Sequence, residues 1–293
     1  MANSITKFKK YIDRLDAVYK QASLTADLDG DSTLVRDGAN ANEIIVPKMS
    51  MDGLADYSRN GGYVSGDVTL TNETVAFNYD RGRKFGVDAM DNEETAGVAF
   101  GRLSSEFIRT KVVPEVDAFR FATYAGISGI SKPVSGATLS TGADVIAALR
   151  TATSGMDEAE VPLENRILYI TPTLYGLVQD LDTSKSKEVL SRFSKIVQVP
   201  QTRFYTAIDL YDGTSSGETG GGYIKDATNG KDINFMVIEK SAVLQYPKHI
   251  VNKVITPEAN QESDKWLFFF REYGLADVYD NKVAGIYLHY KAS

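Results

Sequence analysis

Carboxylate pairs are the first residues whose types and spacing could do chemistry. Glu93 and Glu94 form one pair, and Glu115 and Asp117 form another. A glycosidase needs two carboxylates that flank a cleft, and burial raises the pKa of one of them. Here each pair falls in the expected first turn of a helical segment, where the helix dipole favours negative charge. The sequence therefore favours a structural role for both pairs over catalysis.

Two further motifs match known sites only in their letters. Gly213-Thr-Ser215-Ser-Gly217 has the spacing of a nucleophile elbow, but it lies in a Gly/Ser tract and not between a strand and a helix. Residues 27–31, Asp-Leu-Asp-Gly-Asp, resemble a calcium loop. An EF-hand needs its glycine one place later and a glutamate at the twelfth position, which is Gly38 here. We predict a flexible surface loop at 213–222 and a polar turn at 27–31.

Other catalytic and metal-binding chemistries lack the residues they need. The chain contains no cysteine, so thiol nucleophiles, disulfides and cysteine-bound zinc are excluded. His249 and His289 are the only histidines, and no second histidine stands at metal-ligand spacing. No phosphate-binding glycine motif occurs. We predict no catalytic residue, no metal and no cofactor.

Charge is the next constraint on partners. The 293 residues carry a net charge of -7, which argues against affinity of the whole chain for nucleic acid. Two local basic clusters remain, Lys7/Lys9/Lys10 and Arg81/Arg83/Lys84. Each is either a solvated face or a contact for phosphates or an acidic neighbour. No apolar run is long enough to cross a membrane, and the first residues have no apolar core of the secretory type.

Two segments carry apolar residues but cannot fold alone. Residues 8–19 have the three- and four-residue spacing of an amphipathic helix. Val68 and Leu70 alternate with polar residues, and Val75, Phe77 and Tyr79 resume the alternation after a possible turn at Asn72-Glu73. An isolated hairpin is marginally stable in water. Both segments therefore require a partner surface.

The remaining pattern predicts a long helix, an α/β unit and a β-rich end. Asp91 and Glu94 resemble a capping box at the start of a helix that bends at Pro114 and ends near Gly126. Residues 143–153 are expected to be a helix, 167–170 a buried strand, 172–181 a helix that begins at Pro172, and 188–196 a helix or turn. A second buried strand is expected at 233–238, followed by strands at 266–270, 276–279 and 285–290.

Several stretches resemble the major capsid proteins of tailed bacteriophages with the HK97-type fold. They are KFGVDAMDNEETAG, VVPEVDAFRFATYA, ILYITPTLYGLVQD, VPQTRFY, INFMVIEKSAVL and REYGLADVYDNKVAGIYLHY. None is a catalytic signature, and together they extend over nearly the whole chain. The resemblance implies an α+β fold and a structural protein that is not an enzyme.

The resemblance also implies a division of the chain. Residues 1–42 would be the N-arm, 43–86 the E-loop hairpin, 87–135 the peripheral domain with its long spine helix, 136–240 the α/β axial domain, and 241–293 a return to the peripheral domain. Many relatives carry a long, cleaved scaffolding segment at the N-terminus, which we do not find in this sequence. The chain would then be a mature form or would use a separate scaffold protein.

The implied function is self-assembly into hexamers and pentamers of an icosahedral head that encloses double-stranded DNA. The virion capsid would be its location, after assembly in the host bacterial cytoplasm. Besides copies of itself, its partners would be a portal, scaffold or decoration proteins where the phage uses them, and DNA held by non-specific contact, with no membrane. The candidate contacts between subunits are Tyr57, Arg59, Tyr63, Val64, Phe77, Tyr79, Arg81, Arg83, Lys84, Asp91, Glu93 and Glu94.

Two alternatives remain open at this point. An encapsulin-like bacterial nanocompartment would use the same fold to enclose protein cargo in place of DNA. A polysaccharide-active or carbohydrate-binding phage tail protein would use exposed tyrosines, with Glu94 or Asp117 as the catalytic candidates.

Overall fold

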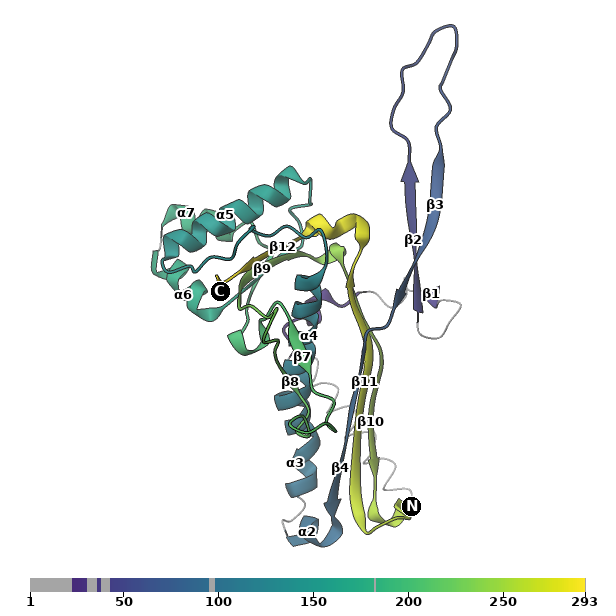
Figure 1. Cartoon of the computed structure of the whole chain (residues 1–293), viewed down its shortest axis with the longest axis vertical. Helices are drawn as coiled ribbons and strands as arrows, with labels where there is room; N and C mark the ends of the chain where they lie inside the picture. The colour runs from purple at the N-terminus through teal and green to yellow at the C-terminus, as the bar shows by residue number, and fades with distance from the viewer. Residues whose placement is uncertain (1–22, 31–35, 38–42, 95–97, 182, 293) are drawn as a thin grey trace.

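The computed structural model describes residues 23–30, 36–37, 43–94, 98–181 and 183–292. The predicted helix at 8–19 and the lysines at 7, 9 and 10 lie outside these residues. The described part consists of an α/β unit, a long helical spine beside a three-stranded sheet, and a hairpin that projects away from both (Figure 1).

The α/β unit is built around a four-stranded sheet of order β12-β9-β5-β6. Only β5 and β6 are parallel to each other. The strands are β5 Arg166–Ile170, β6 Lys195–Gln198, β9 Ile233–Glu239 and β12 Ile286–Tyr290. Every residue of β5 and β9 is buried, because helices cover both faces of the sheet.

Alternate residues of β5 point to different helices. Leu168 and Ile170 pack with the helices α5 Gly142–Glu158, α6 Pro172–Leu181 and α7 Ser184–Leu190. Ile167 and Tyr169 pack on the opposite face against Phe121. The predicted strands at 167–170 and 233–238 and the helix that begins at Pro172 are confirmed. The segment predicted as a helix or turn at 188–196 instead divides into the end of α7 and the start of β6.

The spine consists of α2 Ala89–Glu94, α3 Val98–Phe107, a π-helical turn η3 Ile108–Val112 and α4 Val113–Gly126. The sequence predicted one helix that bends at Pro114, and the structure has a π-helical turn just before this proline. Proline lacks a backbone N–H, so it is tolerated in the first turn of α4. The predicted capping box at Asp91 is wrong, because α2 begins two residues earlier and the backbone N–H of Met90 donates to Asp88.

A three-stranded antiparallel sheet of order β10-β11-β4 packs along the spine. Its strands are β4 Tyr79–Asp88, β10 Val243–Ile255 and β11 Lys265–Val278. One face presents Phe85, Phe268 and Phe270 to Val112 and Val116 of the spine. The sequence predicted short strands at 266–270 and 276–279, which are one continuous strand here, and it missed β10.

The projecting hairpin is formed by β2 Glu43–Met51 and β3 Val68–Ala76, with the two-residue strand β1 Arg36–Asp37 beside β2. The predicted turn at Asn72-Glu73 is wrong, because Asn72 pairs with Pro47 and Glu73 pairs with Val46 inside the ladder. Both residues lie inside one continuous strand, in which the apolar residues change face between Leu70 and Val75. The chain reverses instead in the glycine-containing segment 52–67.

One element departs from the expected division of the chain. Residues 241–293 were expected to return to the peripheral domain, and β10 and β11 do lie along the spine. The last strand, β12, pairs with β9 and completes the sheet of the α/β unit. Its residues Ile286 and Leu288 are buried in the core between that sheet and the spine.

Candidate assembly interface

The hairpin exposes an unusual amount of apolar surface. Among the described residues, thirteen large hydrophobic side chains are exposed, and eight of them lie between positions 49 and 70. These eight are Met49, Met51, Leu54, Tyr57, Tyr63, Val64, Val68 and Leu70. We call residues 50–67 the hairpin tip. Contiguous apolar surface of this kind marks an interaction site in a folded protein.

The hairpin tip has some order of its own. The rings of Tyr57 and Tyr63 meet edge to face with 4.9 Å between centroids. The backbone N–H of Asp67 donates to Asp52 at 2.8 Å, which closes the loop. Tyr63 is nonetheless 91% exposed. The tip is therefore a shaped apolar surface without a partner inside its own subunit.

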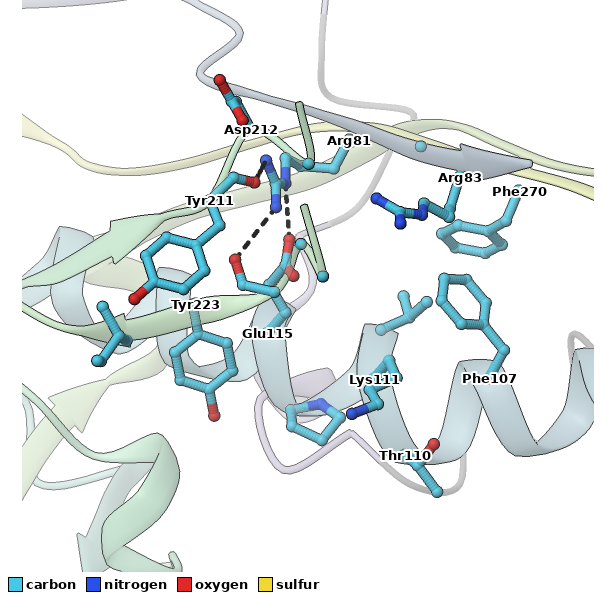
Figure 2. Close-up of a pocket in the computed structure, with 18 of the residues that line it drawn as sticks. Arg81, Arg83, Phe107, Thr110, Lys111, Glu115, Tyr211, Asp212, Tyr223 and Phe270 are labelled. Atoms are coloured by element: carbon cyan, nitrogen blue, oxygen red, sulfur yellow. Dashed lines mark hydrogen bonds and ion pairs between the residues drawn. The ribbon is translucent and has the colours of Figure 1, made fainter. Parts of the chain in front are cut away.

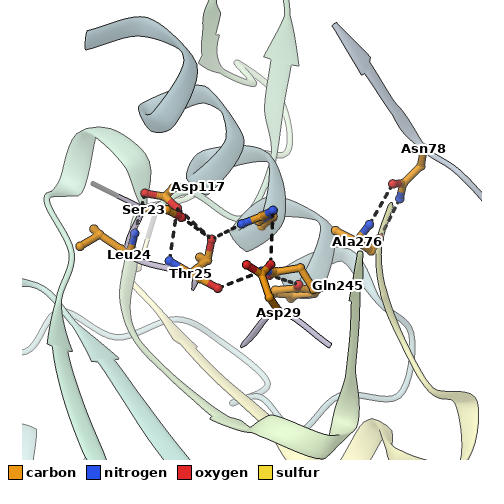
Figure 3. A network of polar contacts seen from close by, with 10 residues as sticks. Ser23, Leu24, Thr25, Asp29, Asn78, Asp117, Gln245 and Ala276 are labelled. Atoms are coloured by element: carbon orange, nitrogen blue, oxygen red, sulfur yellow. Dashed lines mark hydrogen bonds and ion pairs between the residues drawn. The ribbon is translucent and has the colours of Figure 1, made fainter. Parts of the chain in front are cut away.

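The base of the hairpin, in contrast, is fixed to the subunit. Asn78 donates to the carbonyl of Ala276 at 2.8 Å and accepts from its N–H at 3.1 Å (Figure 3). The ring of Phe77 stacks on Tyr273 at 4.9 Å, and Nζ of Lys248 lies 4.7 Å from the centroid of Phe77. Phe77, predicted to contact a neighbouring subunit, is half-buried and packs within its own.

Acidic groups gather where the hairpin passes the segment after β11. Nζ of Lys48 lies 3.4 Å from Oδ2 of Asp280. Burial raises the pKa of Glu73, and the nearby carboxylate of Asp280 raises it further. Burial also raises the pKa of Asp277. The charge balance at this base therefore depends on Lys48.

Tyr79 and Arg81 serve the subunit's own fold. Tyr79 is 6% exposed and packs against Phe119 with 4.8 Å between ring centroids. Arg81 donates from Nε to Glu115 at 2.7 Å and from Nη1 to the carbonyl of Tyr211 at 2.8 Å (Figure 2). Both residues therefore make contacts within their own subunit, and their contact with a neighbour stays a prediction.

The other two basic residues of the cluster are also engaged within the subunit. Arg83 donates from Nη2 to the carbonyl of Thr219 at 2.9 Å. Nζ of Lys84 lies 5.6 Å from the centroid of Phe269. Arg83 is half-buried, whereas Lys84 is exposed on the opposite face of the sheet. Of the three, Lys84 is the most exposed.

A groove of about 950 Å³ lies between β4, the spine and the loop that joins β7 Ile208–Leu210 to β8 Tyr223–Lys225 (Figure 2). Arg81 and Arg83 hold this loop by its backbone carbonyls. The loop contains the Gly213–Gly217 stretch that matched a nucleophile elbow. Ser215 donates its hydroxyl proton to Asp212, and no helix follows it, so the elbow geometry is absent here.

Tyr57, Arg59, Tyr63 and Val64 are all exposed at the hairpin tip. Asp91 is exposed on α2, and Glu93 and Glu94 belong to the same helix, although their side chains are outside the description. The tip and α2 lie at opposite ends of the molecule (Figure 1). The predicted ion pairs between these groups could therefore form only between subunits, and they stay a prediction.

Asp117 has a structural role that the sequence did not reveal. Its side chain is 0% exposed and accepts from the hydroxyl of Thr25 at 2.8 Å and from Ser23 at 3.0 Å (Figure 3). Arg203 lies 3.3 Å away. This carboxylate therefore anchors residues 23–25 to the spine. The contact joins positions about ninety apart in the sequence, so no local sequence pattern predicts it.

The remaining candidates have structural explanations. Asp29 accepts from Gln245 at 2.6 Å, and Asp27 pairs with Lys195. His289 is buried, stacks on Phe235 and lies 3.0 Å from Asn234. No cluster of three or more potential metal ligands occurs among the described residues. Of the described helices, none is both long and apolar enough to span a membrane.

Comparison with known proteins identifies the fold. No family model matches the sequence, and no curated protein matches it. Solved structures do match. A virus-like particle from Pyrococcus furiosus aligns with 97% of this chain and 99% of its own, with a TM-score of 0.62 at 12% identity. Gordonia phage Cozz matches over 92% of this chain and 87% of its own, with a TM-score of 0.61 at 12% identity.

The capsid structure of the cyanophage P-SCSP1u matches over 93% of this chain and 89% of its own, with a TM-score of 0.56 at 15% identity. These matches extend over the α/β unit, the spine with its sheet, and the hairpin, because they cover more than nine-tenths of the chain. The chain therefore has the α+β fold of phage capsid subunits, the HK97-type fold.

Proposed function

We propose that this chain is a major capsid protein that assembles through copies of itself into hexamers and pentamers of an icosahedral phage head. The observation that carries the proposal is the hairpin, which places eight exposed large hydrophobic side chains on an arm with no partner in its own subunit. A shell needs such arms, because each subunit must bind neighbours across a joint. The shared fold of capsid structures supports the same conclusion.

Each part of the fold corresponds to one part of a capsid subunit. Residues 43–86 act as the E-loop, the spine and the β10-β11-β4 sheet as the peripheral domain, and the α/β unit as the axial domain. The 1–42 segment acts as the N-arm. Double-stranded DNA is the content of the assembled head, and a portal completes one vertex.

The test is assembly of the purified chain, followed by sedimentation velocity and negative-stain electron microscopy. We expect rings or closed particles. Leu54→Asp combined with Tyr63→Asp removes apolar surface worth roughly 1.5–3 kcal/mol for each buried side chain and should abolish particles. Leu163→Asp, at an exposed leucine of the α/β unit, is the matched control. A compact monomer under all assembly conditions would reject the proposal.

The contents of particles made in bacterial cells separate the phage head from the nanocompartment alternative. The proposal predicts nucleic acid in heads filled by the complete phage machinery. Particles that always enclose one host protein and no nucleic acid would favour a nanocompartment. Turnover of a polysaccharide by the purified chain would favour the tail-protein alternative.

A further inference from the structure

Two asparagines in the chain are followed directly by glycine. They are Asn60 in the hairpin tip and Asn229 in the turn after β8. Asparagine before glycine is especially prone to spontaneous deamidation, because glycine has no Cβ and its backbone nitrogen can approach the asparagine side chain freely. The two sites share this local chemistry, so their surroundings decide whether each one reacts.

The turn at Asn60 leaves the reacting groups free. Two backbone hydrogen bonds between Ser58 and Gly62, of 3.2 and 2.7 Å, close this turn. Asn60 and Gly61 lie between them and are exposed. The N–H of Gly61 donates to the hydroxyl of Ser58 at 3.1 Å, an exposed hydrogen bond that water can replace at little cost. Among the described residues, no hydrogen bond holds the side-chain amide of Asn60.

The turn at Asn229 is held more firmly. The N–H of Gly230 donates to the carbonyl of Asp226 at 3.1 Å, and the N–H of Asn229 donates to Oδ1 of Asp226 at 2.8 Å. The carbonyl of Asn229 accepts from the hydroxyl of Thr206 at 3.1 Å. A Cβ at Gly230 would lie 2.4 Å from the carbonyl oxygen of Asp226 and 2.9 Å from that of Ala207. The backbone of Gly230 must therefore leave these contacts before its nitrogen can reach the side chain of Asn229.

We propose that Asn60 is a site of spontaneous deamidation and that the fold protects Asn229. Hydroxide removes the proton from the backbone nitrogen of Gly61, and this nitrogen attacks the side-chain carbonyl carbon of Asn60. The new carbon–nitrogen bond closes a five-membered succinimide. The bond to the side-chain nitrogen breaks, and that nitrogen takes a proton from water and leaves as ammonia. Water then opens the succinimide at either of its two carbonyls, which gives aspartate or isoaspartate.

The reaction changes the hairpin tip in charge and in geometry. The tip has a net charge of -2, and both products add one further negative charge. Isoaspartate also inserts a methylene group into the main chain inside the turn. This turn joins Tyr57 to Tyr63, whose rings meet edge to face with 4.9 Å between centroids. A lengthened turn therefore displaces the aromatic pair at the centre of the exposed apolar surface.

Deamidation thus limits the time for which an unassembled subunit remains competent to assemble. Fresh subunits carry the intact tip, and stored subunits accumulate the altered one. The reactive site follows from the turn itself, whereas this consequence rests on the proposed assembly function.

Mass spectrometry of peptides measures both sites in one sample. The purified, unassembled wild type is incubated in mildly alkaline buffer, and the mass change from amide to acid is followed, with enzymatic methylation to detect isoaspartate. Conversion at Asn60 should be roughly tenfold faster than at Asn229, or more, because local opening must precede reaction at Asn229. In urea the two sites should convert at similar rates, since the fold no longer protects Asn229.

Gly61→Ala tests the chemistry while it keeps Asn60. A Cβ at Gly61 would lie 3.4 Å from Oγ of Ser58, so the turn can accept alanine. We expect severalfold slower conversion at Asn60 in this variant and an unchanged rate at Asn229. Gly53→Ala is the matched control in the same tip, because a Cβ there meets nothing within 4 Å, and it should convert at the wild-type rate. Circular dichroism reports the folding of each variant.

The outcomes separate this site from the proposed function. Equal conversion at Asn60 and Asn229 in the folded wild type, or none at Asn60, would overturn the proposal. In sedimentation velocity, stored wild type should assemble less than fresh wild type, and stored Gly61→Ala should keep its assembly. If stored wild type with converted Asn60 assembles as well as fresh protein, the effect on assembly is overturned. If fresh wild type never assembles, the shell function fails, and the peptide measurement still decides the site.

Discussion

Nε of Arg81, on the strand that leads away from the hairpin, lies 2.7 Å from Oε1 of Glu115 on the spine. The same guanidinium donates to the carbonyls of Tyr211 and Gly222 at the two ends of the β7-β8 loop. One side chain thus joins β4, the spine and the β7-β8 loop.

Arg81→Met should lower the free energy of unfolding of the unassembled subunit by about 2 kcal/mol. It removes a half-buried ion pair, leaves the carbonyls of Tyr211 and Gly222 without this donor, and leaves Glu115 with the hydroxyl of Tyr79 at 3.3 Å. Arg109→Met is the control, because Arg109 and Glu106 are 58% and 55% exposed and such pairs contribute below about 1 kcal/mol. Urea denaturation measures both. Equal losses in the two variants would contradict the structural role of Arg81.

Gly213→Ala should destabilise the β7-β8 loop by about 1–2 kcal/mol. Gly213 has φ +77°, and a Cβ there would lie 2.6 Å from Nη1 of Arg83. Gly220→Ala is the matched control in the same loop, because a Cβ at Gly220 meets nothing within 4 Å. Limited proteolysis of the loop, together with urea denaturation, should separate the two variants. A neutral Gly213→Ala would contradict the requirement for a positive φ at this position.

His289→Gln should remove part of the loss of stability in mild acid. Burial lowers the pKa of His289 below its ordinary value of 6.5, so the folded side chain stays neutral. As pH falls below about 6.5, the unfolded chain takes up this proton first, and the free energy of unfolding decreases. Above that pH, the buried neutral His289 causes no loss in the free energy of unfolding.

The measurement is the urea midpoint at pH 7.5 and pH 5.5. His249→Gln is the control, because His249 is the only other histidine and is exposed on β10. We expect the wild type and the His249 variant to lose the same stability between the two pH values, and the His289 variant to lose less. If the His289 variant lost as much stability between pH 7.5 and pH 5.5 as the wild type, the lowered pKa of His289 would be refuted.

Asp117→Ala should cost the subunit about 3 kcal/mol. The carboxylate is fully buried and accepts from Ser23, Thr25 and two backbone N–H groups, so its removal leaves several buried donors unpaired. The residues around Thr25 should also become accessible to protease. Asp180→Ala, at an exposed position on α6, should change stability by less than about 0.5 kcal/mol. A stable Asp117 variant with residues 23–29 still protected would contradict this role.

The elements predicted well are those whose pattern is local. The buried strand at 167–170 has no polar residue, and Pro172 marks the start of α6 by its fixed φ. The hairpin was expected, but its turn was misplaced, because the apolar residues change from even positions, Val68 and Leu70, to odd positions, Val75 and Phe77, and this change of face resembles a turn. Strand β10 was missed, since its apolar residues are interrupted by Pro247, Lys248 and His249.

The candidate contacts between subunits also divide into residues with a local signal in the sequence and residues whose partners are distant in the sequence. The tip residues Tyr57, Tyr63 and Val64 were predicted as contacts because aromatic side chains dominate interface energetics, and all three are exposed. The contacts that Tyr79 and Arg81 make within the subunit were not predicted, because Phe119, Glu115 and Tyr211 lie at least 34 positions away. Long-range pairs of this kind leave no periodic trace in one sequence.

The hairpin tip contributes little to the folding of its own subunit, since its large apolar side chains lie in solvent. Substitutions in the tip are therefore under little selection for subunit stability. They are selected instead by their effect on binding to the neighbouring copy. Every copy carries both sides of such a joint, so a single gene change alters all joints of a shell at once. Evolution of this segment should therefore proceed by paired changes, in which the tip and its receiving surface co-vary across descendants.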